Sequence, residues 1–168
     1  MPQAARSTLT LGALALVLLL MATWGWSQVT APFPQKSDPP TCVERVVTEG
    51  EKVFADQVTV DVFNASGSNG LAGRTMLEFT DAGFGGGDTG NAPSRTEVRA
   101  VQIWTESPRE PDVALVASRL GKAGRIVRRD PLGTGVTVVV GDGFNGLVKG
   151  PRSVRAKGDS EICTPPVE

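Results

Sequence analysis

The hydrophobic positions of this 168-residue chain form one long unbroken run near the start and shorter, periodic segments further on. The run, at residues 9–26, reads LTLGALALVLLLMATWGW and contains no charge. As a helix it would be about 27 Å long, close to the roughly 30 Å hydrocarbon core of a bilayer. Arg6 precedes the run with no acidic residue beside it, and Trp24 and Trp26 lie at the far end. The pattern predicts a transmembrane anchor at 9–27, with residues 1–8 in the cytoplasm.

A cleaved signal peptide is the alternative interpretation of this run. The nearest small-residue cleavage site is Val29-Thr30-Ala31, and Pro32 follows it directly. Both interpretations place the larger part of the chain outside the cell membrane. The expected location is therefore the cell membrane, with a single span and an extracytoplasmic C-terminal domain.

A proline-rich stretch separates the apolar run from the rest of the chain. Residues 30–41 read TAPFPQKSDPPT and include four prolines. Such a composition is typical of a stiff, extended linker. We expect a spacer at 28–41 and one folded domain at 42–168.

Alternating apolar and polar residues predict the strands of this domain. Four segments are predicted as strands: 57–63, 97–105, 125–129 and 135–140. In the first, Val58, Val60 and Val62 share one face. The second carries apolar residues on both faces and should lie inside a sheet, whereas the third should lie at an edge.

Two segments have helical spacing instead. Residues 71–82 form the first, with Gly83 as the residue that ends it. The second runs to about residue 120; Ser107-Pro108-Arg109-Glu110 resembles a capping box at its start, and Gly121 ends it. Segment 42–53 is predicted as a short strand or hairpin arm with a turn at residues 49–51. The glycine-rich residues 84–93 and the tail after 150 are expected to be irregular.

This order of elements predicts an α+β fold. We expect a mixed β-sheet with two helices packed on one face, an α/β sandwich.

Charge and composition argue against several classes of function. The formal net charge is −1, so the basic surface typical of nucleic-acid binding is missing. The chain has no His and no Tyr, which removes the commonest general base and the usual zinc ligand. We therefore predict a protein that is not an enzyme, with no cofactor and no metal. A hydrolase or transferase using Asp61, Asp130 or Asp142 is the alternative; Asp61 is expected to face solvent or be covered by a helix.

The two cysteines, Cys42 and Cys163, lie near the two ends of the domain. Outside the membrane such a pair favours a disulfide, although two free thiols remain the alternative. The bond would close a loop of about 120 residues, worth about 4–5 kcal/mol by loop-closure entropy.

Other motifs are ambiguous. Residues 85–90 fit G-x-G-x-x-G but follow a helix rather than a strand, which favours a loop over a dinucleotide site. Seven basic residues form two clusters that could meet anionic wall polymers or lipid headgroups, or could simply be solvated: Arg125, Arg128 and Arg129, then Lys149, Arg152, Arg155 and Lys157. The turn at 66–70 leads into a predicted helix. The first backbone N–H groups of a helix have no partner within it and favour binding of an anion.

One segment resembles a known family. It reads Val58-x-Val60-x-Val62-x-Asn64-Ala65-Ser66-Gly67-x-x-Gly70-Leu71-Ala72-x-Arg74. This resembles the opening of the LytR C-terminal domain family, and the resemblance extends over about residues 57–147. It implies the stand-alone, membrane-anchored actinobacterial type found in cell envelope integrity proteins. The candidate ligand-binding residues lie in this segment: Asn64, Ser66, Gly67, Gly70 and Arg74.

Anchor, spacer, cysteine pair and resemblance together indicate a non-enzymatic, membrane-anchored envelope protein. We expect it to bind a cell-wall polymer or an envelope protein. The alternative is an accessory regulatory subunit of a wall-glycopolymer ligase made by another chain.

Overall fold

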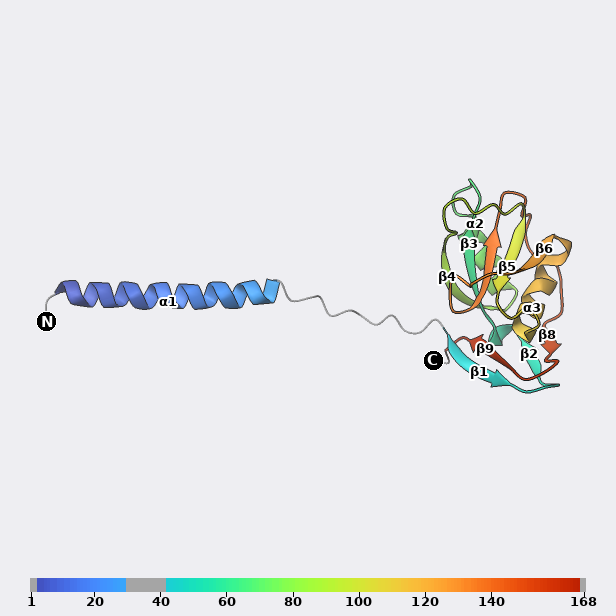
Figure 1. Cartoon of the computed structure of the whole chain (residues 1–168), viewed down its shortest axis with the longest axis horizontal. Helices are drawn as coiled ribbons and strands as arrows, with labels where there is room; N and C mark the ends of the chain where they lie inside the picture. The colour runs from blue at the N-terminus through green and yellow to red at the C-terminus, as the bar shows by residue number, and fades with distance from the viewer. Residues whose placement is uncertain (1–2, 30–41, 167–168) are drawn as a thin grey trace. The chain divides into compact units, whose positions relative to one another are not determined.

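The computed structural model describes residues 3–29 and 42–166. These belong to two compact units, Met1–Asp38 and Pro39–Glu168, whose relative placement is not determined (Figure 1). The predicted spacer at 28–41 falls largely outside the described residues.

The first unit holds one helix, α1 (Gln3–Val29). The predicted helix is thus present and continues through residues 28 and 29. A membrane span needs about 20 consecutive apolar residues. Among the described residues, no helix combines the required length with the required apolar character, so the transmembrane anchor predicted at 9–27 is not supported.

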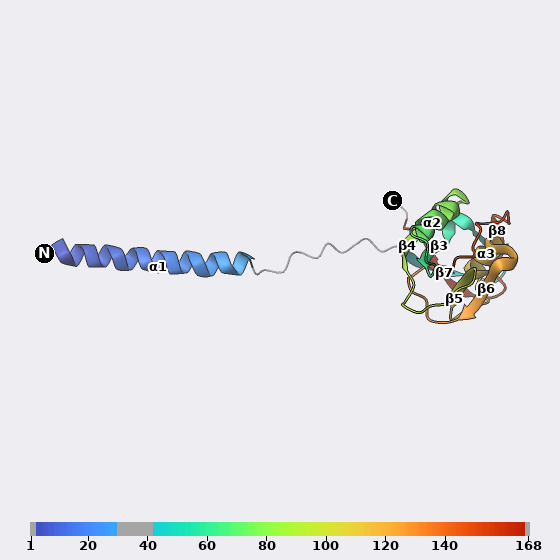
Figure 2. The ribbon, with the colours of Figure 1, turned by 90° about the horizontal axis from the view of Figure 1, so that it is seen from above.

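The second unit is built on a five-stranded mixed sheet with strand order β4-β3-β7-β5-β6 (Figure 2). Its strands are β3 (Thr59–Asn64), β4 (Gly85–Asn91), β5 (Val101–Thr105), β6 (Gly124–Arg128) and β7 (Val136–Val140). Strand β3 runs parallel to both β4 and β7, whereas β5 runs antiparallel to β7 and parallel to β6. The segments predicted as strands therefore all contribute to it, with 97–105 inside and 125–129 at an edge.

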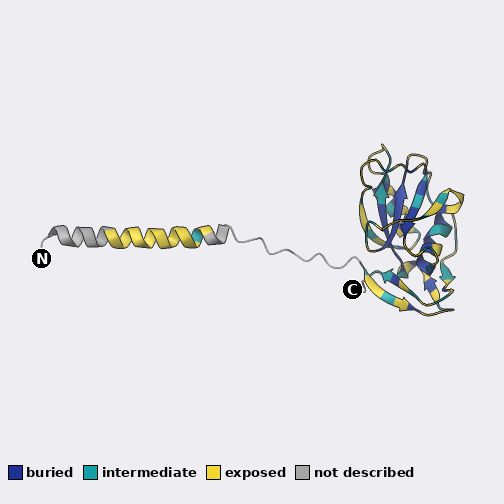
Figure 3. Ribbon diagram, in the orientation of Figure 1, coloured by how far each residue is buried: buried dark blue, intermediate teal, exposed yellow. Residues whose placement is uncertain are grey.

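Two strand–helix–strand units flank the central strand β7. Helix α2 (Leu71–Asp81) connects β3 to β4, and α3 (Pro111–Leu120) connects β5 to β6. Both helices bury their apolar sides in one cluster with the inward-facing strand residues, so they cover the same face of the sheet. The burial pattern in Figure 3 shows this interior. The predicted α+β arrangement, with a mixed sheet and two helices on one face, is confirmed.

The main cluster and a smaller one on the other face lie wholly within residues 47–162. The smaller cluster centres on Val98, Trp104 and Val139. Because the second unit contains its entire core, residues 39–168 form a self-contained folding unit.

Strand β4 corrects a prediction, because its glycine-rich sequence was expected to be an irregular loop. A side chain at Gly85 would collide with Pro165, and one at Gly87 would collide with Asp61. A Cβ at Gly90 would lie 3.3 Å from the Phe63 ring. The glycines therefore allow close approach of neighbours along a paired strand, which periodicity of side chains does not reveal.

The two ends of the domain pair with each other. Strand β1 (Val43–Val47) pairs antiparallel with β9 (Ser160–Thr164), and β2 (Lys52–Phe54) pairs antiparallel with β8 (Ser153–Arg155). Segment 42–53 is thus two strands rather than a hairpin arm, and the tail after 150 is not irregular. Both corrections have one cause: each segment finds its partner about 100 residues away.

The predicted disulfide joins these same ends. Cys42 and Cys163 are bonded, with their Cα atoms 5.4 Å apart and a sequence separation of 121. Cys163 lies in β9, opposite Glu44 of β1. The bond therefore reinforces the β1–β9 ribbon.

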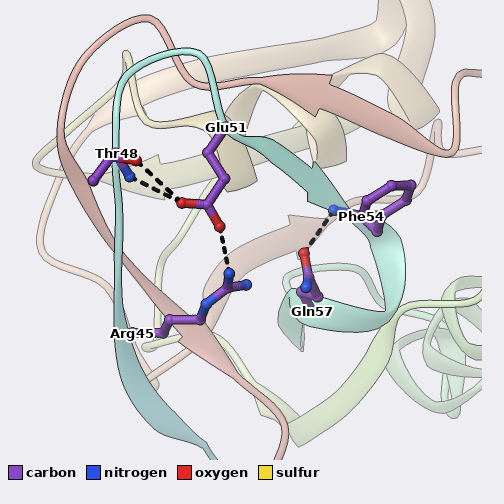
Figure 4. A network of polar contacts seen from close by, with 5 residues as sticks. All are labelled: Arg45, Thr48, Glu51, Phe54 and Gln57. Atoms are coloured by element: carbon purple, nitrogen blue, oxygen red, sulfur yellow. Dashed lines mark hydrogen bonds and ion pairs between the residues drawn. The ribbon is translucent and has the colours of Figure 1, made fainter.

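A small polar network holds the predicted turn between β1 and β2 (Figure 4). The Glu51 carboxylate pairs with the Arg45 guanidinium and accepts a hydrogen bond from the Thr48 N–H at 3.2 Å. The Gln57 side-chain oxygen accepts the Phe54 N–H at 3.0 Å. These bonds fix the chain where it leaves the ribbon and enters the sheet.

Helix α3 begins later than predicted. Its first residue is Pro111, with Glu110 as the N-cap, so the Ser107–Glu110 segment is a turn before the helix rather than its capping box. The Glu110 N–H donates to the Ser107 carbonyl at 3.3 Å. Gly83 and Gly121 follow the last residues of their helices, as predicted, and both have positive φ.

Candidate functional site

The turn predicted to bind a ligand is held together by its own hydrogen bonds. The Asn64 side-chain oxygen accepts the Ser66 N–H at 2.9 Å and the Ser66 hydroxyl at 2.7 Å. The Asn64 amide donates to the Ser68 carbonyl at 2.8 Å, and the Ser68 N–H donates to the Ser66 hydroxyl at 3.1 Å. The polar groups of Asn64 and Ser66 therefore already have partners within the turn.

A distant residue closes this turn. The Asp142 carboxylate, in the loop after β7, accepts the Gly67 N–H at 3.2 Å. Gly70 takes φ +76° as the N-cap of α2, and Arg74 follows on the exposed side of the helix. The structure thus brings the five predicted residues together around one strand-to-helix turn. Asp142 stabilises this turn through its hydrogen bond to Gly67.

Asp61 is buried rather than exposed or helix-covered, which corrects the sequence prediction. Its side chain is 0% exposed, and its two oxygens accept the N–H groups of Asp88 and Gly135, each at 2.7 Å. Burial raises the pKa of this carboxyl, while the two backbone donors lower it. A Cβ on Gly87 or Gly133 would overlap the carboxylate. Asp61 therefore ties β4 and the loop before β7 to β3.

A small cavity of about 170 Å³ lies beside the disulfide and is lined by four carboxylates: Glu44, Glu110, Asp112 and Glu161. Asp112 is 5% exposed. Burial raises the pKa of its carboxyl to about 6, and the nearby Glu110 charge contributes to the rise. A hydrogen bond from the Val113 N–H acts in the opposite direction. Burial and the Glu161 charge also raise the pKa of Glu110. Within the described ranges, no group of three or more His, Cys, Asp or Glu residues is arranged to hold a metal ion.

One residue of the first predicted basic cluster and two of the second line one groove, together with the carboxylates Glu106, Glu110 and Asp159. This basic groove has a volume of about 950 Å³ and lies between the turn before α3 and the loop from β8 to β9. Its cationic residues are Arg109, Arg128, Arg155 and Lys157. Arg128 comes from the first predicted cluster and Arg155 and Lys157 from the second, and all four are exposed.

The remaining members of the clusters lie elsewhere. Arg129 stacks on the Trp104 ring, with 4.3 Å from its guanidinium carbon to the ring centroid. Arg152 lines a different hollow, with Asp56 and Asp81. Lys149 is exposed in the loop after β7. Only three of the seven predicted basic residues therefore share the groove.

A second hollow lies at the opposite end of the edge strand β6. It has a volume of about 490 Å³, and its cations are Arg99, Lys122 and Arg125. Arg99, Lys122 and Arg109 were not among the predicted basic clusters. Lys122 lies three residues before Arg125, so spacing could have joined it to the first cluster. Charge clustering along the chain carried no signal for Arg99 and Arg109.

With this geometry in place, comparison with protein families identifies the domain. A family model described as "LytR cell envelope-related transcriptional attenuator", LytR_C, matches residues 57–144. The chain belongs to the LytR_C family. The match begins just before β3 and ends just after β7, so it covers the whole five-stranded sheet and both helices that pack on it. The family predicted from the Val58–Arg74 segment is thus confirmed.

No curated protein matches the chain significantly. Among solved structures, it is similar to the soluble domain of a conserved hypothetical secreted protein from Mycobacterium marinum, at 21% sequence identity and a TM-score of 0.45. That match covers 61% of this chain and 69% of the other.

Proposed function

We propose that this LytR_C protein is a non-catalytic binding module of the bacterial cell envelope, and that its basic groove holds a cell-wall polymer. The family description supports the envelope role. The observation that supports binding is the groove itself, where cations from β6, the turn before α3 and the β8–β9 loop meet around about 950 Å³. Three separate elements contribute side chains, as is usual for a binding site placed on a rigid fold.

The arrangement of the carboxylates supports a non-catalytic role. Asp61 is enclosed, and both of its oxygens accept backbone N–H groups. Asp142 holds the Gly67 turn. A general acid or base must reach a substrate proton within hydrogen-bond distance, which an enclosed carboxylate does not do. The Asp61 carboxylate is therefore structural, and the exposed Asp142 carboxylate is bonded to the Gly67 turn.

The disulfide supports an extracytoplasmic location for the domain. Disulfides form and persist in oxidising compartments and are rare in the cytoplasm. The bond joins the first and last strands of the domain, so reduction would loosen the β1–β9 ribbon. We infer that the domain works on the outer side of the cell membrane.

Co-sedimentation with purified bacterial cell-wall sacculi tests this function. The fragment of residues 39–168, which contains the whole core, is mixed with sacculi in the oxidised and the reduced state. Saturable sedimentation of the oxidised fragment, with an uncharged polysaccharide gel as the control solid, is the expected result. If the oxidised fragment stays in the supernatant at every sacculus concentration, the proposed function is wrong.

A further inference from the structure

The charge distribution around β6 points to the class of polymer. We propose that the ligand is an extended anionic polysaccharide, which enters the basic groove and continues along the outer edge of β6 to the second hollow. This inference rests on the proposed wall-binding function and specifies its ligand.

The residues that line the two hollows carry a net positive charge, whereas the whole chain carries a small net negative charge. The chain as a whole carries 17 basic and 18 acidic residues. The hollows together are lined by seven cations, Arg99, Arg109, Lys122, Arg125, Arg128, Arg155 and Lys157, and by the four carboxylates Glu97, Glu106, Glu110 and Asp159. A locally positive surface on a weakly negative protein attracts and orients anionic partners.

These cations are available to a ligand. All seven are exposed, and none of them forms an ion pair within the described part of the chain. Arg155 also donates to the Gly50 carbonyl at 2.9 Å and Asp159 accepts the Glu49 N–H at 3.0 Å, but both side chains stay exposed. The seven cations exceed the four carboxylates by three, so the two hollows keep an excess of positive charge.

Strand β6 links the two hollows. Arg125 lies near its start and borders the second hollow, and Arg128 lies at its end and borders the basic groove. Three residues of strand separate these two positions by about 10 Å. β6 pairs with β5 on one side only, so its outer edge faces no other described strand. Because Arg125 and Arg128 are three positions apart, their side chains leave opposite faces of the strand, and a polymer that crosses this open edge would meet both.

The spread of the cations favours a polymer over a small anion. A single phosphate is best bound by converging donors, whereas here the cations follow a strand and two flanking hollows. The recessed shape favours a polymer over a lipid surface, because a flat layer of headgroups would not fill a groove of about 950 Å³. An extended chain with repeated phosphodiester or carboxylate groups fits both features.

Fluorescence anisotropy with labelled probes tests the ligand class. The fragment of residues 39–168 is titrated into labelled sodium polyphosphate, poly-L-glutamate and dextran. The groove variant is Arg109→Gln/Arg128→Gln/Lys157→Gln, which leaves intact the Arg155 bond to the Gly50 carbonyl. The matched control, Lys52→Gln/Lys149→Gln/Arg152→Gln, also removes three exposed cations, all outside both hollows.

Both polyanions should bind and dextran should not. The groove variant should bind each polyanion at least about tenfold more weakly and with a shallower salt dependence, because fewer counterions are released. The control should stay within about twofold of the wild type. Equal weakening in groove variant and control, or binding of dextran, would overturn the proposal. Circular dichroism and urea unfolding must first show that both variants are folded.

Two further arms separate the sources of negative charge. Sacculi stripped of their phosphodiester-linked and acidic polysaccharides should lose the fragment, while inorganic phosphate at equal total charge should not displace it from intact sacculi. Unchanged binding to stripped sacculi would refute the proposal that the ligand is an anionic polysaccharide, but it would leave the proposed wall-binding function standing. Binding to anionic phosphatidylglycerol vesicles that depends on the same cations, and is absent with sacculi, refutes both.

Discussion

The buried carboxylate of Asp112 should make the domain more stable in mild acid than at neutral pH. Asp112 is 5% exposed at the start of α3, and its pKa is raised from 3.8 to about 6. The folded state therefore takes up a proton between pH 6 and 4 that the unfolded chain does not yet hold. Stability should rise as the pH falls through this window and stop changing, as far as Asp112 is concerned, below about pH 4.

The size of the effect follows from the shift. A difference of about two pKa units corresponds to about 3 kcal/mol, which is the penalty for keeping Asp112 ionised at neutral pH. Asp112→Asn removes the charge and keeps an oxygen that accepts the Val113 N–H. The variant should be about 2–3 kcal/mol more stable than the wild type at pH 7.5 and about equal to it at pH 4.

Urea unfolding monitored by tryptophan fluorescence, at half-unit steps from pH 4 to 8, measures this difference. Asp61 and Glu110 also have raised pKa values, so the wild-type curve alone does not isolate Asp112. The difference in unfolding free energy between the wild type and Asp112→Asn isolates the effect of Asp112. The control is Asp130→Asn, which replaces an exposed carboxylate. Parallel wild-type and Asp112→Asn curves over the whole range would refute the assigned cause.

Three further predictions concern the architecture. Gly87→Ala should destabilise the domain by about 2–3 kcal/mol in urea, because its Cβ would overlap a buried carboxylate, whereas Gly67→Ala, with nothing within 4 Å, should cost under about 1 kcal/mol; equal costs would contradict the close packing of β4. Replacing Cys42 and Cys163 by Ala should cost about 4 kcal/mol, and an unchanged urea midpoint would show that the bond does not restrain the ends. Asn64→Ala should cost about 1–3 kcal/mol through the lost turn bonds, and it would leave wall binding unchanged; a stable variant that no longer binds would return the turn to the candidate site.

Local patterns determined much of the framework. The alternation around Val58, Val60 and Val62 predicted β3, and all three valines are fully buried. Helical spacing predicted α2, and the glycine at position 83 predicted its end. The motif at Asn64–Arg74 indicated the family. These features depend on neighbours within a few residues, and such neighbours are read directly along the chain.

Pairings between distant segments were not predictable in the same way. Strand β4 has glycine at four of its seven positions, so it carries almost no side-chain pattern, and only its parallel neighbour β3 makes it a strand. The terminal strands β8 and β9 are short and polar, and they are ordered by partners about 100 residues earlier.

The candidate site depended on the same long-range contacts. The sequence left open whether the two basic clusters meet an anionic polymer, meet lipid headgroups or are simply solvated, and it gave no signal for Arg99 and Arg109, which line the two hollows. The sequence by itself therefore predicted four of the five sheet strands and both helices that pack on the sheet, favoured the cysteine pair and indicated the family. The tertiary structure alone decided that Asp61 is enclosed and that separate basic residues meet around β6, because both follow from which strands lie side by side.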